Sequence, residues 1–325
     1  MSYCKLFKHG VTIDPDGSIL PCCVFDKKDY PKFAFEDDWY SKHMEMYEQS
    51  KHGWLDACHG CKTVEERDGH SYRTTYNRKL EDFDAQQGIL FWDLKINNTC
   101  NLACRICGAF SSSTWEQIVK DPANNGLGAH YGRIRGNRWH KEVKDLTHEL
   151  DGAMEVKFTG GEPIMIPQVR KIINYLIEKD LAKNINLALT TNGTWDLSAY
   201  YEKFAQFKDI TVTVSADGTG PLFNYLRQNA DWDQVWPNIL DIKKNVKNIF
   251  VLCTPQALNN HLLSDIKQFF ADHDINCIFN QPVYSPVWMK PNALDDPELK
   301  QKFVEQMTIL DRIHGTNYKE HMPCQ

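Results

Sequence analysis

Six short runs rich in β-branched and aromatic residues alternate with longer helical patterns over most of this chain. The runs are "ILFWDLKI" (89–96), "AMEVKFTG" (153–160), "NINLALTT" (184–191), "DITVTVSA" (209–216), "KNIFVLCT" (247–254) and "NCIFNQPV" (276–283). Each run predicts a strand. Because repeated strand–helix–strand units pair their strands in parallel with right-handed crossovers, the order favours an α/β sheet, either doubly wound or closed into a full or partial barrel.

Polar, turn-forming segments follow four of the predicted strands directly. These segments are "NNTC", "TGGEP", "TTNG" and "SADGTG". In parallel α/β folds, ligands and catalytic groups gather beyond the carboxyl ends of the strands. The sequence therefore predicts one pocket shared by these four loops.

The composition is that of an ordinary globular enzyme. Hydrophobic residues make up 42% and charged residues 25% of the 325 residues, and the net charge is −6. No run approaches the roughly 20 apolar residues that span a bilayer, and "MSYCKLFKHG" lacks the apolar core of a signal peptide. We expect a cytoplasmic protein without a membrane segment, and the interspersed charges argue against nucleic acid as a partner.

Eleven cysteines are unusual for a reducing compartment, and eight of them fall into two groups. Cys100, Cys104 and Cys107 follow the first predicted strand, whereas Cys253, Cys277 and Cys324 stand alone and are read as small core residues. Structural zinc needs four ligands, and no fourth Cys or His lies near the trio in sequence. An iron–sulfur cubane accepts one ligand per iron, so three thiolates would leave one iron open for chemistry.

The pattern Cys-x3-Cys-x2-Cys after a first strand, with "GGEP" one strand later, resembles the radical S-adenosylmethionine (SAM) superfamily. That resemblance implies a partial (β/α)6 TIM-like barrel, and a [4Fe–4S] cluster on Cys100, Cys104 and Cys107. It also implies that SAM binds the open iron through its amino and carboxylate groups. Reductive cleavage of SAM would then give a 5′-deoxyadenosyl radical.

The resemblance also implies which other residues bind SAM. The segment after the second strand would hold the methionyl amino group, the loops after the third and fourth strands would contact the ribose and the carboxylate, and an arginine fork suits a carboxylate. The residues implied are Gly160, Gly161, Glu162, Pro163, Thr191, Asn192, Ser215 and Arg227. From the residues alone, Arg227 can also be a surface residue and Asn192 a turn former, while Asp217 is either a turn residue or a substrate-facing acid.

Residues 1–85 are poor in apolar runs, so a metal or another staple is expected to hold this front unit together. Its cysteines, Cys4, Cys22, Cys23, Cys58 and Cys61, can make either zinc knuckles or a closed iron–sulfur site. The string C…DPDGxxxPC…CxxC resembles the auxiliary-cluster modules called SPASM and Twitch, although here it precedes the barrel. The resemblance implies one auxiliary [4Fe–4S] cluster on Cys4, Cys22, Cys58 and Cys61, with Cys22 favoured over Cys23.

The predicted organisation is an auxiliary domain over 1–85, a radical SAM core over 86–290 and a closing helix with its tail over 291–325. Between the first two strands, "DPANNGLGAHYGRIRGNRW" (121–139) is read either as a lid over the site or as a plain surface loop.

The function implied is that of a radical SAM enzyme with two clusters, of an oxidoreductase or peptide-modifying type. Its substrate would be a peptide or protein side chain, or else a sugar, nucleoside or other small metabolite, and its electron donor a flavodoxin or ferredoxin. A zinc-knuckle binding protein and a two-cluster electron-transfer protein are the alternatives, and neither needs the GGEP loop.

Overall fold

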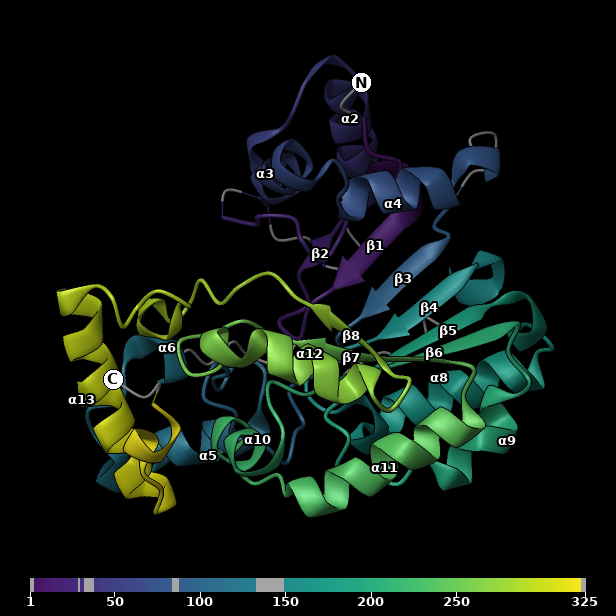
Figure 1. The fold of residues 1–325 in the computed structure, drawn as a ribbon. Helices are drawn as coiled ribbons and strands as arrows, with labels where there is room; N and C mark the ends of the chain where they lie inside the picture. Colours follow the sequence, from purple (N-terminus) through teal and green to yellow (C-terminus); the bar gives the residue numbers. More distant parts are fainter. Residues whose placement is uncertain (1–2, 29, 32–37, 84–87, 133–148, 323–325) are drawn as a thin grey trace.

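The computed structural model describes residues 3–28, 30–31, 38–83, 88–132 and 149–322. They form one eight-stranded sheet in the order β2-β1-β3-β4-β5-β6-β7-β8 (Figure 1). The strands are β1 (Gly10–Ile13), β2 (Ile19–Leu20), β3 (Phe91–Leu94), β4 (Glu155–Phe158), β5 (Asn186–Thr191), β6 (Asp209–Ser215), β7 (Asn248–Cys253) and β8 (Asn276–Phe279). The sheet is open, with β2 and β8 at its edges.

The six predicted strands are confirmed as β3 to β8, and every neighbouring pair among them is parallel. The alternation of buried and half-buried side chains along each strand explains why these strands form. In β5, Leu187 and Leu189 are buried in the main core, whereas Ala188 and Thr190 point to the opposite face and are half-buried. The predicted α/β class is therefore confirmed.

The front unit contributes two strands that the sequence pattern did not predict. Strand β1 pairs in parallel with β3, and β2 returns antiparallel to β1 across the "DPDGS" turn. The sheet therefore continues across residue 85, where the sequence suggested a domain boundary. That boundary stays a prediction.

Helices cover both faces of the sheet. They are α1 (Leu6–His9), α2 (Trp39–His52), α3 (His59–Asp68), α4 (Tyr72–Lys79), α5 (Ser113–Lys120), α6 (Ala129–Gly132), α8 (Pro167–Glu178), α9 (Tyr201–Phe204), α10 (Gly220–Leu226), α11 (Trp232–Asn245), α12 (Leu263–Ala271) and α13 (Pro297–His314). Figure 1 shows α8, α9 and α11 below the sheet and α2 to α4 above it. The main core lies between the sheet and the lower helices.

Short 3-10 turns connect these elements. They are η1 (Asp56–Cys58), η2 (Glu81–Phe83), η3 (Pro122–Asn124), η4 (Leu150–Gly152), η5 (Pro163–Met165), η6 (Ala182–Asn184), η7 (Ser198–Tyr200), η8 (Asn260–Leu262), η9 (Val287–Met289) and η10 (Tyr318–His321). The stretch read as a lid or loop contains η3 and α6, and its residues 133–139 lie outside the described ranges.

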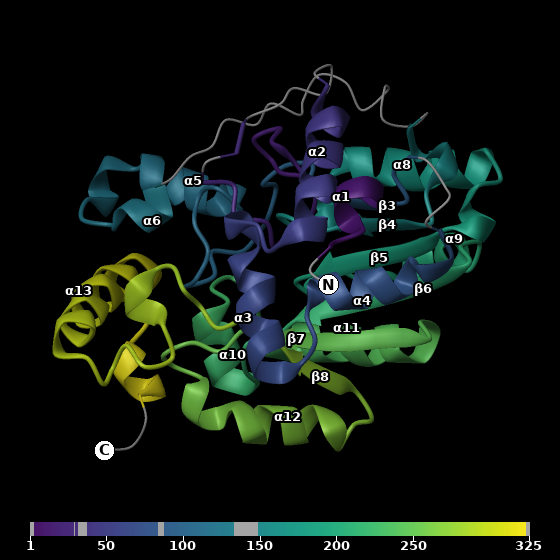
Figure 2. The ribbon, with the colours of Figure 1, turned by 90° about the horizontal axis from the view of Figure 1, so that it is seen from above.

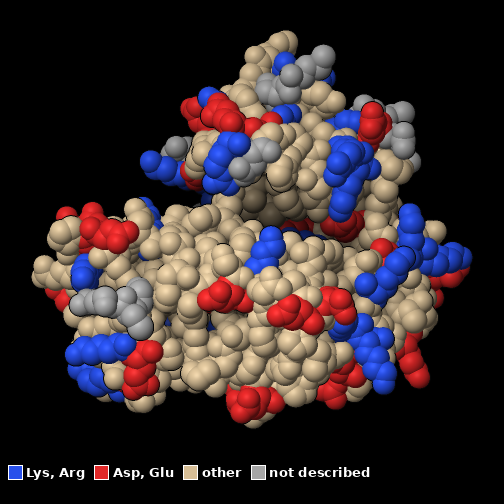
Figure 3. Space-filling model, viewed as in Figure 1, with Lys and Arg blue, Asp and Glu red and all other residues tan. Residues whose placement is uncertain are grey.

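The front unit extends over the upper face of the sheet. Viewed from above, α3 and α4 lie across the strands (Figure 2). A Cβ built on Gly60 of α3 would stand 4.0 Å from the amide nitrogen of Gln281, which follows β8 at the far edge of the sheet. In the space-filling view the upper lobe overhangs the body with a hollow between them, and charges of both signs are interspersed on this face (Figure 3).

The helix expected near the C-terminus is present as α13. Asp296 caps its start by accepting hydrogen bonds from the backbone of Glu298 and Leu299, and Gly315 ends it in the left-handed region. With α5, α6 and α10 it encloses a second buried cluster that includes Trp115, Tyr131, Phe303, Met307 and Leu310. None of the helices in the described ranges is both long and apolar enough to cross a membrane.

Candidate active site

The cysteine trio lies in the loop that leaves the carboxyl end of β3. Backbone hydrogen bonds fix this loop to the end of α10: Ala103 N donates to Gln228 O (3.0 Å) and Arg105 N to Leu226 O (2.9 Å). Inside the loop, Cys107 N donates to Cys104 O at 3.0 Å. Cys104 is buried, while Cys100 and Cys107 are half-buried. The three thiols are thus held on a firmly anchored loop.

The thiols of the trio influence one another electrostatically, which places them close together. Burial and then the charge of Cys104 raise the pKa of Cys100 to about 11. Burial also raises the pKa of Cys107, with Cys104 and Cys100 as the next causes. Three thiolates close together and shielded from water need a positive partner, and a metal centre that displaces their protons supplies one. The trio therefore fits the predicted cluster.

The two glycines of "TGGEP" meet different requirements. Gly160 adopts a φ of +97°, which side chains rarely tolerate. A Cβ on Gly161 would stand 2.2 Å from the carbonyl oxygen of Thr99, the residue before Cys100. The sequence suggested that these glycines let the backbone approach a ligand; at Gly161 the close approach is to the trio's own loop.

Glu162 is fully buried beneath this turn, and Pro163 begins η5 next to it. Its carboxylate accepts hydrogen bonds from the Thr191 hydroxyl (3.0 Å) and from the backbone N–H of Asn192 (2.7 Å). Burial raises the pKa of Glu162 to about 7. The loop after β4 is thereby tied to the loop after β5.

Asn192 connects the loop after β5 to the trio. Its amide nitrogen donates to Asn101 Oδ1 at 2.9 Å and lies 3.9 Å from Cys100 Sγ. Its amide oxygen also accepts from the backbone of Thr194 at 2.9 Å, as expected of a turn former. Asn192 therefore fits both a residue of the SAM pocket and a turn former.

Arg227 is buried, not a surface residue. It makes an ion pair with Asp217 Oδ2 at 2.9 Å, and the charges of Cys104 and Cys107 contribute to the raised pKa of Arg227 against the effect of burial. Asp217 Oδ1 also accepts the backbone N–H of Thr254 at 2.9 Å. Asp217 thus holds Arg227 beside the trio. Ser215 ends β6 in the same region, half-buried.

Four cysteines of the front unit line one pocket. They are Cys4, Cys22, Cys58 and Cys61, and Phe25, Tyr72 and Arg73 are among the other residues of the wall. The thiols affect one another: after burial, the charges of Cys58 and Cys61 are among the causes that raise the pKa of Cys4 to about 12. The set that the sequence favoured therefore surrounds one space.

Cys23 faces another way. After burial, the groups that most affect its pKa are Lys157, Asp93 and Lys95 on the sheet, and its side chain makes a hydrogen bond with Tyr72. It does not line the pocket of the other four. This geometry favours Cys22 over Cys23 as the fourth thiol.

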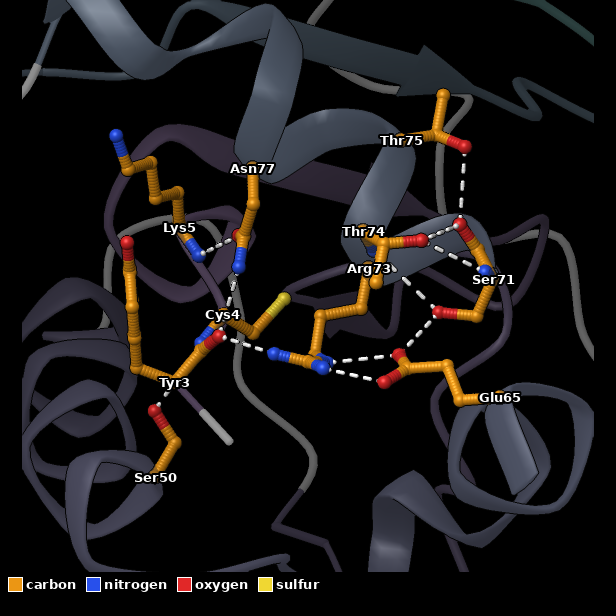
Figure 4. A network of polar contacts seen from close by, with 10 residues as sticks. All are labelled: Tyr3, Cys4, Lys5, Ser50, Glu65, Ser71, Arg73, Thr74, Thr75 and Asn77. Atoms are coloured by element: carbon orange, nitrogen blue, oxygen red, sulfur yellow. Dashed lines mark hydrogen bonds and ion pairs between the residues drawn. The ribbon is translucent and has the colours of Figure 1, made fainter. Parts of the chain in front are cut away.

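A buried arginine holds the segment that carries Cys4 (Figure 4). Arg73 makes an ion pair with Glu65 and donates to the carbonyl oxygen of Tyr3 at 2.9 Å. Asn77 donates to the same oxygen (2.9 Å) and accepts from Lys5 N (2.8 Å). Both neighbours of Cys4 are therefore fixed to α4.

The isolated cysteines lie where small core residues were expected. Cys253 on β7 and Cys277 on β8 are buried in the main core. Cys324 lies outside the described ranges.

One link between distant segments has no signal in the sequence. Arg105, between two cysteines of the trio, is fully buried and donates to Asp311 (3.4 Å) on α13 and to Thr316 (2.6 Å) beyond it. Its guanidinium also lies over the ring of Tyr225, 4.3 Å from the centroid. Tyr225 lies 120 residues from Arg105 in sequence, and Asp311 and Thr316 lie 206 and 211 residues from it, so no local pattern indicates these contacts.

Comparison with known proteins gives the family. The model of the Radical SAM superfamily matches residues 94–265, more than half of the chain. An uncharacterized protein of Methanocaldococcus jannaschii, MJ0907, is 30% identical over 126 residues, which are 38% of this chain and 37% of that protein. A GTP 3′,8-cyclase of Syntrophomonas wolfei is 22% identical over 236 residues, 69% of this chain and 65% of the relative. The chain thus spans less than two thirds of either relative's length.

Among solved structures, native anSMEcpe with bound AdoMet and Cp18Cys peptide is 21% identical, covering 58% of this chain and 49% of that one with a TM-score of 0.42. The family match spans the trio, the GGEP turn and the loops after β5 and β6, all of which meet at one end of the sheet. This chain belongs to the radical SAM superfamily.

Proposed function

We propose that this protein is a radical SAM enzyme that uses a [4Fe–4S] cluster on Cys100, Cys104 and Cys107. The observation that carries the proposal is the meeting of Glu162, Asn192 and Arg227, from three different loops, beside the trio. When bound, the cluster supplies the electron that cleaves SAM to the 5′-deoxyadenosyl radical, which abstracts hydrogen from a substrate carbon.

The residues around the trio bind and orient SAM in this proposal. The backbone of Gly160, Gly161, Glu162 and Pro163 holds the methionyl amino group. Arg227 and Ser215 hold the carboxylate, with Asp217 fixing the direction of the arginine fork. Thr191 and Asn192 border the ribose.

We assign a second [4Fe–4S] cluster to Cys4, Cys22, Cys58 and Cys61, as in Twitch-like modules. Their shared pocket supports this assignment. Four thiolates suit either a single zinc or a cubane, and the resemblance to Twitch-like modules favours the cubane.

For the substrate we propose a peptide or protein side chain, modified by an oxidative or related radical reaction. The enzyme would work in the cytoplasm with a flavodoxin- or ferredoxin-type electron donor. A nucleotide-like metabolite is the second candidate, favoured by the similarity to GTP 3′,8-cyclases over about two thirds of the chain.

The test is anaerobic reduction of the iron-reconstituted protein with dithionite in the presence of SAM. We expect 5′-deoxyadenosine from the wild type and none from Cys104→Ala. Cys253→Ala, which removes a buried core thiol on β7, is the matched control and should keep the activity. If the wild type made no 5′-deoxyadenosine, or Cys104→Ala made as much, the proposal would be wrong.

A further inference from the structure

The side of the sheet opposite the main core forms an inner face that the front unit covers. Register places Thr12, Asp93, Lys157, Ala188 and Thr211 in one line across β1, β3, β4, β5 and β6. The residues between them along each strand, such as Val11, Trp92 and Val156, are buried in the main core. Alternation therefore assigns this line to the inner face.

Three lysines lie at one end of the described inner face, whereas its carboxylates Glu155 and Asp209 lie nearer the amino ends of β4 and β6. Lys95 donates to Asp14 (2.9 Å), Lys27 makes an ion pair with the same carboxylate, and Lys157 donates to Asp93 (3.2 Å). We call Lys27, Lys95 and Lys157 the lysine row. Farther along, β5 and β6 present Ala188, Thr190, Thr211 and Thr213, which are uncharged.

The lysines of the row are more exposed to solvent than the aspartates that pair with them. The three lysine side chains keep 24–26% of their surface exposed, whereas Asp14 keeps 5% and Asp93 8%. Burial alone would raise the pKa of Asp14, but Lys95 and Lys27 outweigh it and hold that pKa below its ordinary value. A third aspartate, Asp16, lies 3.9 Å from Lys27 and keeps 9% of its side chain exposed, so the aspartates equal the lysines in number but are the more buried. The accessible charge at this place is therefore positive.

An ammonium group has three donor hydrogens. Among the described residues, Lys95 and Lys157 each donate to a single carboxylate. Lys157 lies on β4 and Lys95 directly follows β3, and the charge of Lys95 is among those that act on Lys157, so one ligand group can accept from both lysines. An oxyanion with two or three acceptor oxygens fits such a pair.

The lysine row borders the proposed SAM pocket. A Cβ on Gly160 of the GGEP turn would meet Lys95 Cβ at 3.2 Å. Lys27 Nζ lies 5.6 Å from the ring centroid of Phe110, three residues after the trio. A group held by the row would therefore lie next to the radical source.

We propose that the lysine row binds an oxyanionic group of the substrate, a carboxylate or a phosphate. The group anchors the substrate on the inner face at its β1–β4 end and leaves the rest of the molecule against the hydroxyl-lined strands β5 and β6. The assignment rests on the proposed function only in naming the bound molecule as the substrate.

The test uses inorganic phosphate and succinate as probes of the two chemistries. Each is titrated into the iron-reconstituted protein with SAM present, and the midpoint of thermal unfolding is followed against chloride of equal ionic strength. A ligand that binds only the folded state raises this midpoint as its concentration rises, which gives a dissociation constant. The variants are Lys95→Met, Lys157→Met and Asp93→Asn, with Lys183→Met, an exposed lysine paired with Asp180, as the control.

We expect at least one probe to bind specifically, with affinity lowered about tenfold in Lys95→Met and Lys157→Met and unchanged in the control. Asp93→Asn should bind about two- to fivefold more tightly, because it removes a competing carboxylate. A variant that fails to fold cannot show this increase in affinity for the probe. Phosphate binding alone indicates a phosphorylated substrate, and succinate binding alone indicates a carboxylate.

The proposal is overturned if neither probe raises the midpoint beyond chloride, or if the lysine variants bind as the wild type does. Production of 5′-deoxyadenosine tests the proposed function separately from anion binding. If the protein binds the probes through the lysine row but makes no 5′-deoxyadenosine, the anion site stands and the proposed radical chemistry is wrong.

Discussion

At the scale of single residues, the site depends on one contact between two backbones. The GGEP turn after β4 packs directly on the Asn98–Thr99 segment that leads into Cys100, and the absence of a side chain at Gly161 makes this possible. The loop that holds the trio and the loop that would hold the methionyl group are therefore one packed unit.

Gly161→Ala should separate these two loops. Its Cβ would stand 2.2 Å from Thr99 O, so the backbone must move, and we expect a loss of about 1–3 kcal/mol in unfolding free energy. The trio should then retain less iron. Urea unfolding and iron content check this, with Gly152→Ala as the control because nothing lies within 4 Å of a Cβ there. Equal iron content and stability in both variants would contradict the account.

The spacing of the cysteines and the GGEP turn predicted the residues that gather at the trio, because both are local patterns. The role of Asp217 could not be predicted in the same way. In sequence it precedes a glycine in "SADG" and fits either a turn residue or a substrate-facing acid, and its partner Arg227 lies ten residues later, at the end of α10. Only the fold brings the two charges to 2.9 Å.

At the scale of elements, α13 reaches back to the trio's loop. Asp311 accepts hydrogen bonds from Tyr225 OH (3.0 Å) and Tyr318 N (2.6 Å) as well as from Arg105. The helix therefore contacts the loop of the trio directly as well as closing the end of the fold. It neutralises a buried cation located between two cysteines of the trio.

Asp311→Ala should leave Arg105 buried without its counter-charge and cost about 3–5 kcal/mol in unfolding free energy. Glu298→Ala breaks the Glu298–Lys302 pair, which is exposed on the same helix, and should change little. Urea unfolding of both variants measures the difference. If the two variants had equal stability, Arg105–Asp311 would not be a buried anchor.

Strands β3 to β8 followed from alternation in the sequence, but β1 and β2 did not. "GVTI" lies between a basic segment and the "DPDGS" turn and β2 has only two residues, so neither stands within a longer β-rich run as β3 to β8 do. Their place in the sheet depends on pairing β1 with β3, across about 80 residues of chain. Such a contact is a property of the fold and has no local signature.

At the scale of the whole molecule, the front unit continues the sheet through β1 and lies over its inner face through α3 and α4 (Figure 2). Cys23 and Tyr72 of this unit approach Asp93 and Lys157 of the sheet. The inner face with its lysine row therefore lies between the front cysteines and the strands that lead to the trio. In the proposed enzyme, a substrate bound on the inner face would lie between the two clusters.

The most direct test is electron paramagnetic resonance of the reduced, iron-reconstituted protein, with and without SAM, for the wild type and Cys58→Ala. We expect two [4Fe–4S] signals in the wild type, of which SAM changes one. Cys58→Ala should lose the other signal and keep the SAM-sensitive one. A single signal in the wild type, or two signals that both ignore SAM, would contradict the central claim.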